Sequence, residues 1–244
     1  MTGRTSLGRL TEPQSVFVLR ARPYLEHGQL VDFFSRETGL VTGVSRHSRS
    51  PRSALRALFQ PFSLIRAELG GSSELKSIAF AELQRNYTLS PRETLCAQYL
   101  NELLFYLLEP EVPQPEIFER YSRTLQHLSE QGVTGVEPLL RFFELGLLSD
   151  IGYGVNFFTD STGREISPDI LYSYDPGDGF VPSPGGPFAF RGDEIIRMSR
   201  GQMESPEVLR AAKRLCRTAI GSHLGNRRLR SRELYAELCG ALTA

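Results

Sequence analysis

The sequence predicts an α+β protein of several domains, in which a small N-terminal β-barrel precedes a mainly helical domain. Three observations give this prediction. Short apolar and β-branched runs alternate with turn signals up to about residue 85, and helical periodicity replaces them from about residue 90. Glycine and proline then interrupt both patterns between residues 152 and 204. We therefore expect a barrel over 1–86, a helical domain over 87–151 and 205–244, and a loop-rich insertion over 152–204.

Five short runs predict the strands of the barrel. The runs at 30–35 and 40–44 flank a glycine-containing turn, which is typical of a β-hairpin. A strand-like run at 16–19 precedes this hairpin, and two more, at 62–69 and 75–81, follow it. About five strands within this length suit a small closed barrel, of which the OB fold is one.

Start signals mark the first helices. Ser90 and Glu93 have the spacing of a capping box, and Pro91 stands at the first helical position. The apolar spacing of residues 117–128 predicts a second helix, and a third is expected to begin at Pro138.

Two further helices are expected near the C-terminus. Ser205 followed by Pro206 is another cap signal, and the helix that it starts should reach about Gly221. A last helix is expected to start at Ser231, with leucines at helical spacing behind it.

The cysteines and the lack of export signals indicate a cytoplasmic protein. Their number is odd, and they lie far apart in segments expected to be helical: Cys96, Cys216 and Cys239. We interpret them as buried free thiols of a reducing compartment. No apolar run reaches about 18 residues, and no secretory signal begins the chain, so we expect no membrane partner.

A net charge of zero hides an uneven distribution of charge. Residues 42–66 hold five arginines and no acid, residues 86–150 hold ten acids and four arginines, and residues 210–232 hold eight basic residues and no acid. We call 46–56 the loop zone and 210–232 the C-terminal zone. Both zones would attract a polyanion, because arginine and serine side chains donate to phosphate oxygens. The C-terminal zone also leads into a helix N-terminus, which itself favours an anion.

Signals for catalysis are weak. The four histidines form no metal-spaced pair, and no nucleophile-elbow, zincin or P-loop motif occurs. Asp175 and Asp178 lie in a turn that lacks the other ligands of a calcium loop, so we expect an Asx turn. We therefore expect a protein that is not an enzyme and has no cofactor. A hydrolase in the insertion stays open as an alternative, with the carboxylates of Asp160, Asp169, Asp175 and Asp178.

Several motifs, taken in their order and spacing, resemble the RecO family of recombination mediators. In the barrel these are residues 18–44 and the loop zone as it runs into 58–62. In the helical part they are 99–104 and 140–153, and near the end they are 229–232. The resemblance covers about residues 14–240.

The resemblance implies an OB fold, a helical domain and a zinc-finger-like insertion. It implies a protein of the cytoplasmic nucleoid that binds single- and double-stranded DNA and anneals complementary strands. Together with RecR, such a protein helps to load RecA onto DNA coated by single-strand-binding protein. A protein-interaction adaptor, whose arginines only keep it soluble, is the alternative from another class.

We assign DNA binding to arginines of the barrel and of the two basic zones. The loop zone and the barrel face would hold one strand, and the C-terminal zone would hold a second strand or a duplex. Phe33 and Phe34 are expected in the core more than in base stacking. The predicted DNA-binding residues are Arg20, Arg46, Arg49, Arg52, Arg56, Arg214, Arg217, Arg227, Arg228, Arg230 and Arg232. The acidic tail of single-strand-binding protein, which relatives dock on the helical domain, would be received by Arg120, Arg123 or Arg141.

Many relatives carry a four-cysteine zinc module after the glycine–tyrosine pair. Here the first two ligand positions fall at about Thr159 and Thr162, and no cysteine follows Gly186 until Cys216. A structural zinc site needs nitrogen or sulfur ligands. We therefore expect an insertion of similar shape without a metal.

Overall fold

The computed structural model describes residues 12–46, 48, 53, 55–71, 73–132 and 135–242, with side chains as far as residue 237. The chain forms two compact units, which we describe separately. The first unit comprises Met1–Gly132 and Leu229–Ala244, and the second comprises Val133–Arg228. This division differs from the expected domains, because it places the helices of the expected helical domain in both units.

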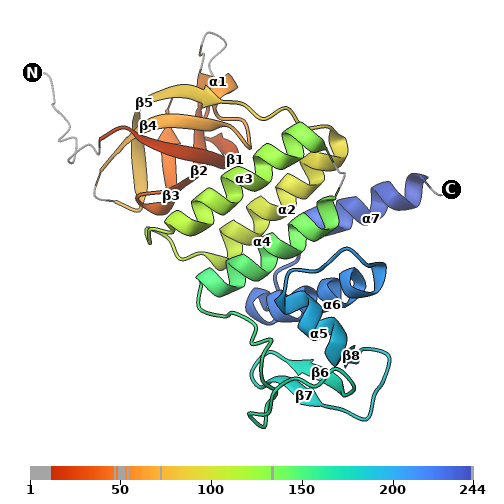
Figure 1. The fold of residues 1–244 in the computed structure, drawn as a ribbon. Coiled ribbons are helices and arrows are strands. Elements are labelled where there is room, and N and C mark those ends of the chain that lie inside the picture. The colour runs from red at the N-terminus through yellow and green to blue at the C-terminus, as the bar shows by residue number, and fades with distance from the viewer. Residues whose placement is uncertain are drawn as a thin grey trace, which may run out of the picture. The chain divides into compact units, whose positions relative to one another are not determined.

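Five strands close into an OB-like barrel in the first unit, as the sequence predicts (Figure 1). The order around the barrel is β1-β2-β3-β5-β4, with β3 and β5 parallel. The predicted hairpin joins β2 to β3 with Gly39 at φ 72°, where an added Cβ would lie 2.0 Å from the Val112 carbonyl oxygen. The strand bounds are Gln14–Tyr24 (β1), Gly28–Ser35 (β2), Gly39–Ser45 (β3), Leu64–Gly70 (β4) and Leu75–Arg85 (β5).

Side chains of β1 and β2 alternate between the barrel interior and a layer of helices. Val16, Val18 and Phe33 are fully buried in the barrel core. Phe17 and Phe34 are also fully buried, but they face outward and pack on aromatic rings of helix α3. The expectation that Phe33 and Phe34 serve as core is therefore confirmed.

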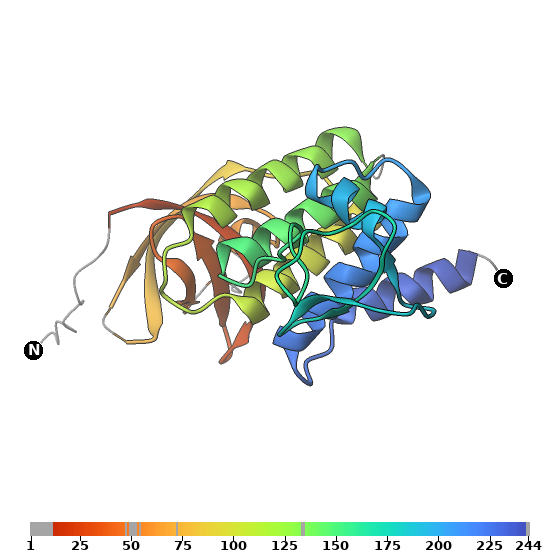
Figure 2. The ribbon, with the colours of Figure 1, turned by 60° about the horizontal axis from the view of Figure 1, so that its bottom comes forward.

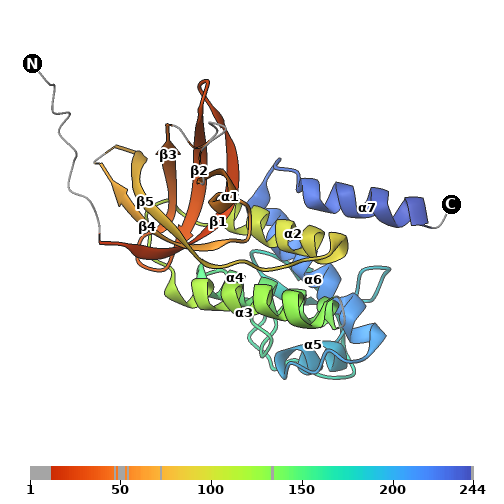
Figure 3. The same ribbon diagram turned by 90° about the horizontal axis from the view of Figure 1, so that it is seen from above.

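The long helices in the described part of the first unit are Pro91–Leu107 (α2), Pro115–Gln131 (α3) and Arg230–Leu242 (α7). Helix α2 packs on both α3 and α7 (Figure 3). Asn101 of α2 donates to the Leu19 carbonyl of β1 at 2.7 Å and accepts a hydrogen bond from the Tyr121 hydroxyl of α3. Burial raises the pKa of Tyr121, so its hydroxyl stays a donor. One buried amide therefore ties two helices to the barrel.

The helix starts of this unit follow the predictions in part. Pro91 lies in the first turn of α2, as predicted, but the Ser90 side chain makes no capping hydrogen bond, so the predicted capping box is wrong. Glu93 is buried instead. Helix α7 begins one residue before the predicted Ser231. A short helix, α1 (Leu55–Leu58), lies at the end of the loop zone.

The described residues of the second unit form helices and a small sheet (Figure 2). The strands pair antiparallel in the order β7-β6-β8. The Ser205 side chain accepts from the Val208 amide at 3.4 Å and caps α6, as predicted, whereas α4 begins two residues before Pro138. The bounds are Val136–Asp150 (α4), Leu171–Asp175 (β6), Gly179–Pro182 (β7), Phe190–Arg191 (β8), Gly192–Ser199 (α5) and Pro206–Leu224 (α6).

Helix α5 was not anticipated from the sequence. Glu194 starts it by accepting a hydrogen bond from the Arg191 amide at 3.0 Å. Gly192 is required there, because an added Cβ would lie 1.8 Å from the Ser167 carbonyl oxygen. The apolar face of α5 joins a core around Phe180 that also includes residues of β6, β8 and α6. Glycine and proline on both sides of this short helix concealed its apolar spacing.

The described thiols are free. Cys96 of α2 and Cys216 of α6 are buried and unbridged, as expected, whereas the side chain of Cys239 lies outside the described part. Burial, together with nearby Glu93, raises the pKa of Cys96 to about 11, so this thiol is unreactive at neutral pH. None of the helices in the described ranges has the length and apolarity needed to cross a membrane.

Candidate nucleic-acid interface

The loop zone begins where strand β3 ends. Arg46 follows the last residue of β3, and Arg56 lies on α1; both are exposed, and within the described ranges neither makes an ion pair. The close approach of Gly28 to the Ser45 carbonyl places Arg46 beside the β1–β2 turn. The predicted residues Arg49 and Arg52 lie outside the described residues.

Arg20 is held on the barrel surface by a buried acid. Its Nε lies 2.8 Å from a carboxylate oxygen of Asp32, and Arg22 contacts the same oxygen at 2.6 Å. Thr42 donates to the other oxygen at 2.8 Å. The Arg20 guanidinium also stacks over the Phe105 ring, 4.0 Å from its centroid. Part of the charge of Arg20 is therefore compensated inside the protein.

Most basic side chains of α6 already have partners. Arg210 and Lys213 pair with Glu207 at 3.1 Å and Glu137 at 3.3 Å. Arg214 donates to the Ala189 carbonyl at 3.0 Å and lies over the Phe190 ring at 4.8 Å. Arg217, by contrast, is exposed and makes no hydrogen bond or ion pair through its side chain within the described ranges.

The N-terminus of α7 is occupied by a carboxylate of the same chain. Glu102 of α2 accepts hydrogen bonds from the Arg230 and Ser231 amides, both at 3.1 Å, and from the Ser231 hydroxyl at 2.5 Å. The expectation that this helix end attracts a phosphate is therefore corrected, because Glu102 is the anion there. Arg232 is also engaged, through the Tyr99 hydroxyl at 2.9 Å and a stack on its ring.

The C-terminal zone thus divides between the two units. Residues 210–228 belong to the second unit, and Arg230 and Arg232 belong to the first. Arg227, Arg228 and Arg230 have exposed side chains. The basic residues of this zone are continuous in the sequence, but the structure divides them between two units.

The three arginines predicted for partner binding lie in different environments. Arg123 is exposed on α3, and Arg120 is half-buried on the same helix. Arg141 of α4 is only 7% exposed, and its guanidinium lies 2.6 Å from the Glu144 carboxylate. The placement of Arg141 corrects the expectation for this residue, because a buried, ion-paired guanidinium does not present its charge to a peptide.

The turn at the expected zinc position is organised by hydrogen bonds. One carboxylate oxygen of Asp160 accepts from the Thr162 amide at 2.8 Å, the Thr162 hydroxyl at 2.7 Å and the Arg164 amide at 3.2 Å. The Thr162 hydroxyl bond lowers the pKa of Asp160 most. Asn156, just before this turn, donates through its side-chain amide to the Thr159 hydroxyl at 2.7 Å and accepts from the Thr159 backbone amide at 3.3 Å. Hydroxyls bonded in this way do not supply zinc ligands, and no cluster of potential metal ligands was found among the described side chains.

The carboxylates of the hydrolase alternative do not form one site in the described structure. Asp175 accepts from the amides of Gly177 and Asp178 at 2.8 and 3.1 Å, which confirms the predicted Asx turn at the β6–β7 hairpin. Asp160 is used in its own turn, and Asp169 is exposed. No three of these acids gather where they would hold a metal ion, as judged over the described residues.

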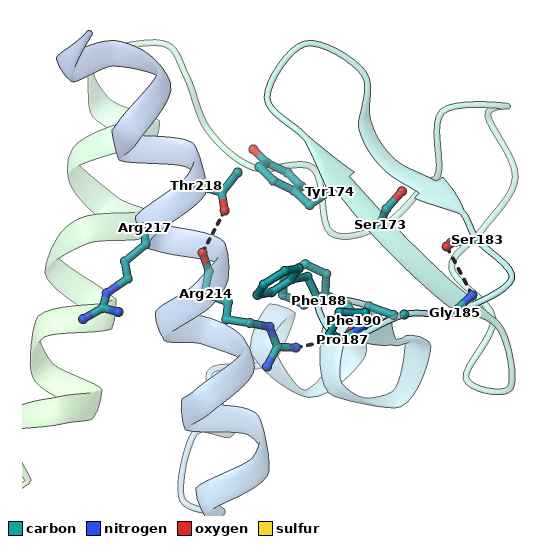
Figure 4. Close-up of a pocket in the computed structure, with 12 residues that line it drawn as sticks. Ser173, Tyr174, Ser183, Gly185, Pro187, Phe188, Phe190, Arg214, Arg217 and Thr218 are labelled. Atoms are coloured by element: carbon teal, nitrogen blue, oxygen red, sulfur yellow. Dashed lines mark hydrogen bonds between the residues drawn. The ribbon is translucent and has the colours of Figure 1, made fainter. Parts of the chain in front are cut away.

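Two pockets bring together residues that the sequence does not connect. In the first unit, Arg20, Phe105 and Arg230 line a pocket of about 300 Å³ between β1, α2 and α7. In the second unit, Arg214 and Arg217 share a pocket of about 480 Å³ with Phe188 (Figure 4). Sequence reasoning missed Phe188; its only signal is an aromatic residue inside a glycine- and proline-rich run.

Known protein families match both the N-terminal and the C-terminal part of the chain. Family models described as Recombination protein O N terminal and C terminal match residues 11–87 and 89–233. A DNA repair protein RecO of Tolumonas auensis is 42% identical over 93% of this chain and 97% of its own length. Proteins of the same name from Vibrio cholerae and Aliivibrio fischeri are 39% and 37% identical, over 92% and 91% of this chain and 93% and 94% of their own.

Proposed function

Because the chain belongs to the RecO family of DNA repair proteins, we propose that it is a recombination mediator that binds DNA and anneals complementary strands. With RecR, it would help to load RecA onto DNA coated by single-strand-binding protein, at the nucleoid in the cytoplasm. The observation that carries the proposal is the presence of exposed, unpaired Arg46 and Arg56 beside an OB-like barrel, within the described part of the chain.

Single-stranded DNA would bind along the end of the barrel where the loop zone lies. Arg46 and Arg56 are available for phosphates, since neither guanidinium has to break an ion pair with a described carboxylate before it binds. Arg20 would contribute less, because Asp32 holds its guanidinium. Binding through phosphates is insensitive to sequence and weakens steeply with salt.

A second strand or a duplex would bind through the exposed residues of the C-terminal zone. Arg217 and Arg228 of the second unit supply charge that the described residues do not neutralise. Neutralising phosphates on two strands lowers their mutual repulsion and favours pairing. About six contacts would give log–log salt slopes near −5 on duplex and near −4 on single strands.

We propose that this activity involves no covalent chemistry. Strand annealing forms hydrogen bonds between bases, and a protein assists it by binding and charge neutralisation alone. Support comes from Asp160 and Asp175, the most engaged of the candidate carboxylates, which accept hydrogen bonds within their own turns.

Docking of the acidic tail of single-strand-binding protein would rely on exposed cations of the helices. With Arg141 buried against Glu144, Arg123 is the most accessible of the three predicted residues. A titration with a tail peptide tests this: Arg123→Ala should weaken binding, and an unchanged affinity would remove the residue from the proposal.

A protein-interaction adaptor is favoured by one observation on the barrel. Strand β5 pairs with β3 through Leu75–Ser77 only, and farther along it exposes the apolar side chains of Phe80 and Leu83. Exposed apolar residues on a strand suit a protein partner. Binding of DNA that does not respond to salt, or no binding, would favour this hypothesis over the mediator.

Annealing of two complementary oligonucleotides, each coated with the cognate single-strand-binding protein, is the decisive experiment. The mediator should accelerate annealing at low salt and lose the effect at high salt. Addition of RecR and RecA then tests filament loading. No acceleration by protein with a native circular dichroism spectrum would contradict the proposal and leave the adaptor as the better hypothesis.

A further inference from the structure

The larger of the two pockets lies wholly within the second unit. Its walls come from β6, the loop between β7 and β8, strand β8 and helix α6. Gly185 and Gly186, at φ 115° and 144°, shape that loop and contribute no side chains to their part of the rim. The pocket of about 480 Å³ falls within the range typical of sites for small organic groups.

The described lining is cationic and contains no carboxylate. Arg214 and Arg217 lie one helical turn apart on α6, and the other lining residues are uncharged. Arg214 is half-buried and fixed by Ala189 and Phe190, yet its Nε is buried without a hydrogen-bond partner in the described structure. The pocket therefore offers positive charge to an electron-rich ligand.

An aromatic side chain stands open at the mouth of the pocket. Phe188 is 75% exposed, although it lines the pocket together with buried Phe190. Figure 4 shows Phe188, Phe190 and Tyr174 on the same side of α6, with the Arg214 guanidinium close to them and Arg217 directed away. Burial raises the pKa of Tyr174, so its hydroxyl remains a hydrogen-bond donor at neutral pH.

From these features we infer that the pocket takes one unstacked nucleotide of single-stranded DNA. The base stacks on Phe188, its polar edge meets the donors of Arg214 and Tyr174, and the flanking backbone passes the exposed Arg217. Aromatic stacking combined with a cationic groove is the general mode of binding single strands without sequence preference. A base in a duplex is already stacked and paired, so a duplex does not enter the pocket.

The inference rests on the proposed function and assigns to the 152–204 insertion a direct role in holding a strand. The occupant is a nucleotide because the pocket pairs an open aromatic face with positive charge and carries no acid for a basic ligand. An acidic peptide shares part of that chemistry and is a competing outcome of the test below.

The test uses tryptophan as a reporter, because the chain contains none. In the full-length Phe188→Trp variant, the sole indole stands at the mouth of the pocket. A single-stranded oligothymidylate of about 15 nucleotides, near the upper site size of one barrel domain, should quench its emission. The quench should saturate at the Kd measured by anisotropy of a labelled oligonucleotide. A duplex of equal length, which offers no unstacked base to the indole, should quench the emission much less even when it is bound.

Phe158→Trp is the matched control, because Phe158 is 74% exposed in the same unit and does not line the pocket. Its emission should not change. In anisotropy titrations with the labelled oligonucleotide, Phe188→Ala should weaken single-strand binding about tenfold, the size of one stacking interaction, and Phe158→Ala should leave it within twofold. Both side chains are exposed, so folding should be unaffected.

The outcomes separate the pocket from the proposed function. Normal DNA binding by anisotropy without a quench in Phe188→Trp, or an equal quench in both tryptophan variants, overturns the nucleotide pocket and leaves the mediator intact. A quench by a short acidic peptide with a free C-terminus, and none by oligothymidylate, also overturns it. Absence of DNA binding by the unchanged protein removes both ideas.

Discussion

The two basic zones differ in how much of their charge the protein itself uses. In the loop zone, described Arg46 and Arg56 are exposed and make no ion pair in the described structure. In the C-terminal zone, Arg210, Lys213 and Arg232 each have a partner within the fold. The C-terminal zone has more basic residues in the sequence, but among the described residues it has the smaller share of unpaired basic side chains.

The difference teaches that a basic run in a sequence measures potential charge, and its partners decide how much a ligand can use. Glu102 is the clearest example, because it occupies the helix end that the preceding arginines make attractive to phosphate. An arginine that already stacks on an aromatic ring or pairs with an acid contributes to stability first. DNA affinity should therefore depend on the basic side chains that have no partner in the fold, and not on how closely basic residues are spaced in the sequence.

The largest expected effect is on duplex binding by the free cations of the second unit. Removal of one phosphate-binding cation should lower duplex affinity about eightfold at about 0.1 M salt, from the counterion-release exponent. Arg217→Ala combined with Arg228→Ala should therefore weaken duplex binding about 60-fold. The log–log salt slope should become shallower by about 1.8. Anisotropy titrations at several salt concentrations measure both quantities.

A matched double variant removes the same charge from paired positions of the same unit. Arg210→Ala combined with Lys213→Ala takes away two cations that face Glu207 and Glu137. Exposed ion pairs are weak, so folding should be retained. Duplex affinity should fall no more than about threefold, because neither cation is fully available to a phosphate. An equal loss of duplex affinity in the two double variants would show that ion pairing within the fold does not decide which cations bind DNA.

The next effect concerns single strands at the loop zone. Arg46→Ala combined with Arg56→Ala should weaken binding of an oligothymidylate about 25-fold, at about fivefold for each cation on single strands. The reduction should be similar for other base sequences, since phosphates carry no sequence information. Arg22→Ala is a suitable control, because Asp32 holds that guanidinium at 2.6 Å. If the affinity of the double variant stayed within twofold of that of the unchanged protein, single-stranded DNA would have to bind outside the loop zone.

The sequence predicted the barrel well because local signals agree there. The apolar run of β1 and the glycine turn before β3 are both found in the structure, and Gly39 is required by the close approach of Val112. Helix α5 was missed, since its eight residues, which begin at Gly192, make only about two helical turns within a segment rich in glycine and proline. The burial of Arg141 and the Glu102 contact to α7 could not be foreseen, because they depend on packing between residues brought together by the fold.

A smaller effect is expected where Glu102 occupies the helix end. Glu102→Ala removes three hydrogen bonds from the start of α7 and should lower the free energy of unfolding by about 1.5 kcal/mol. Urea denaturation measures this change. Glu102→Gln keeps an acceptor and should lower the free energy of unfolding by about half as much. Unchanged stability of Glu102→Ala would mean that the three hydrogen bonds to Glu102 contribute nothing to the stability of the start of α7.

The smallest effect tests how the insertion is held together without metal ligands. Asp160→Ala removes the acceptor shared by Thr162 and Arg164 and should lower the Tm by about 3 °C. The hydrogen bond from Thr162 holds the pKa of Asp160 below its usual value, so the ionised form stabilises the folded state. The difference in Tm between wild type and variant should therefore be full at neutral pH and shrink as pH falls below about 4. Asp160→Asn keeps the acceptor oxygen and cannot ionise, so its Tm difference from Asp160→Ala should not vary with pH. A wild-type advantage that persists unchanged at pH about 2 would show that the carboxylate charge contributes nothing to the turn.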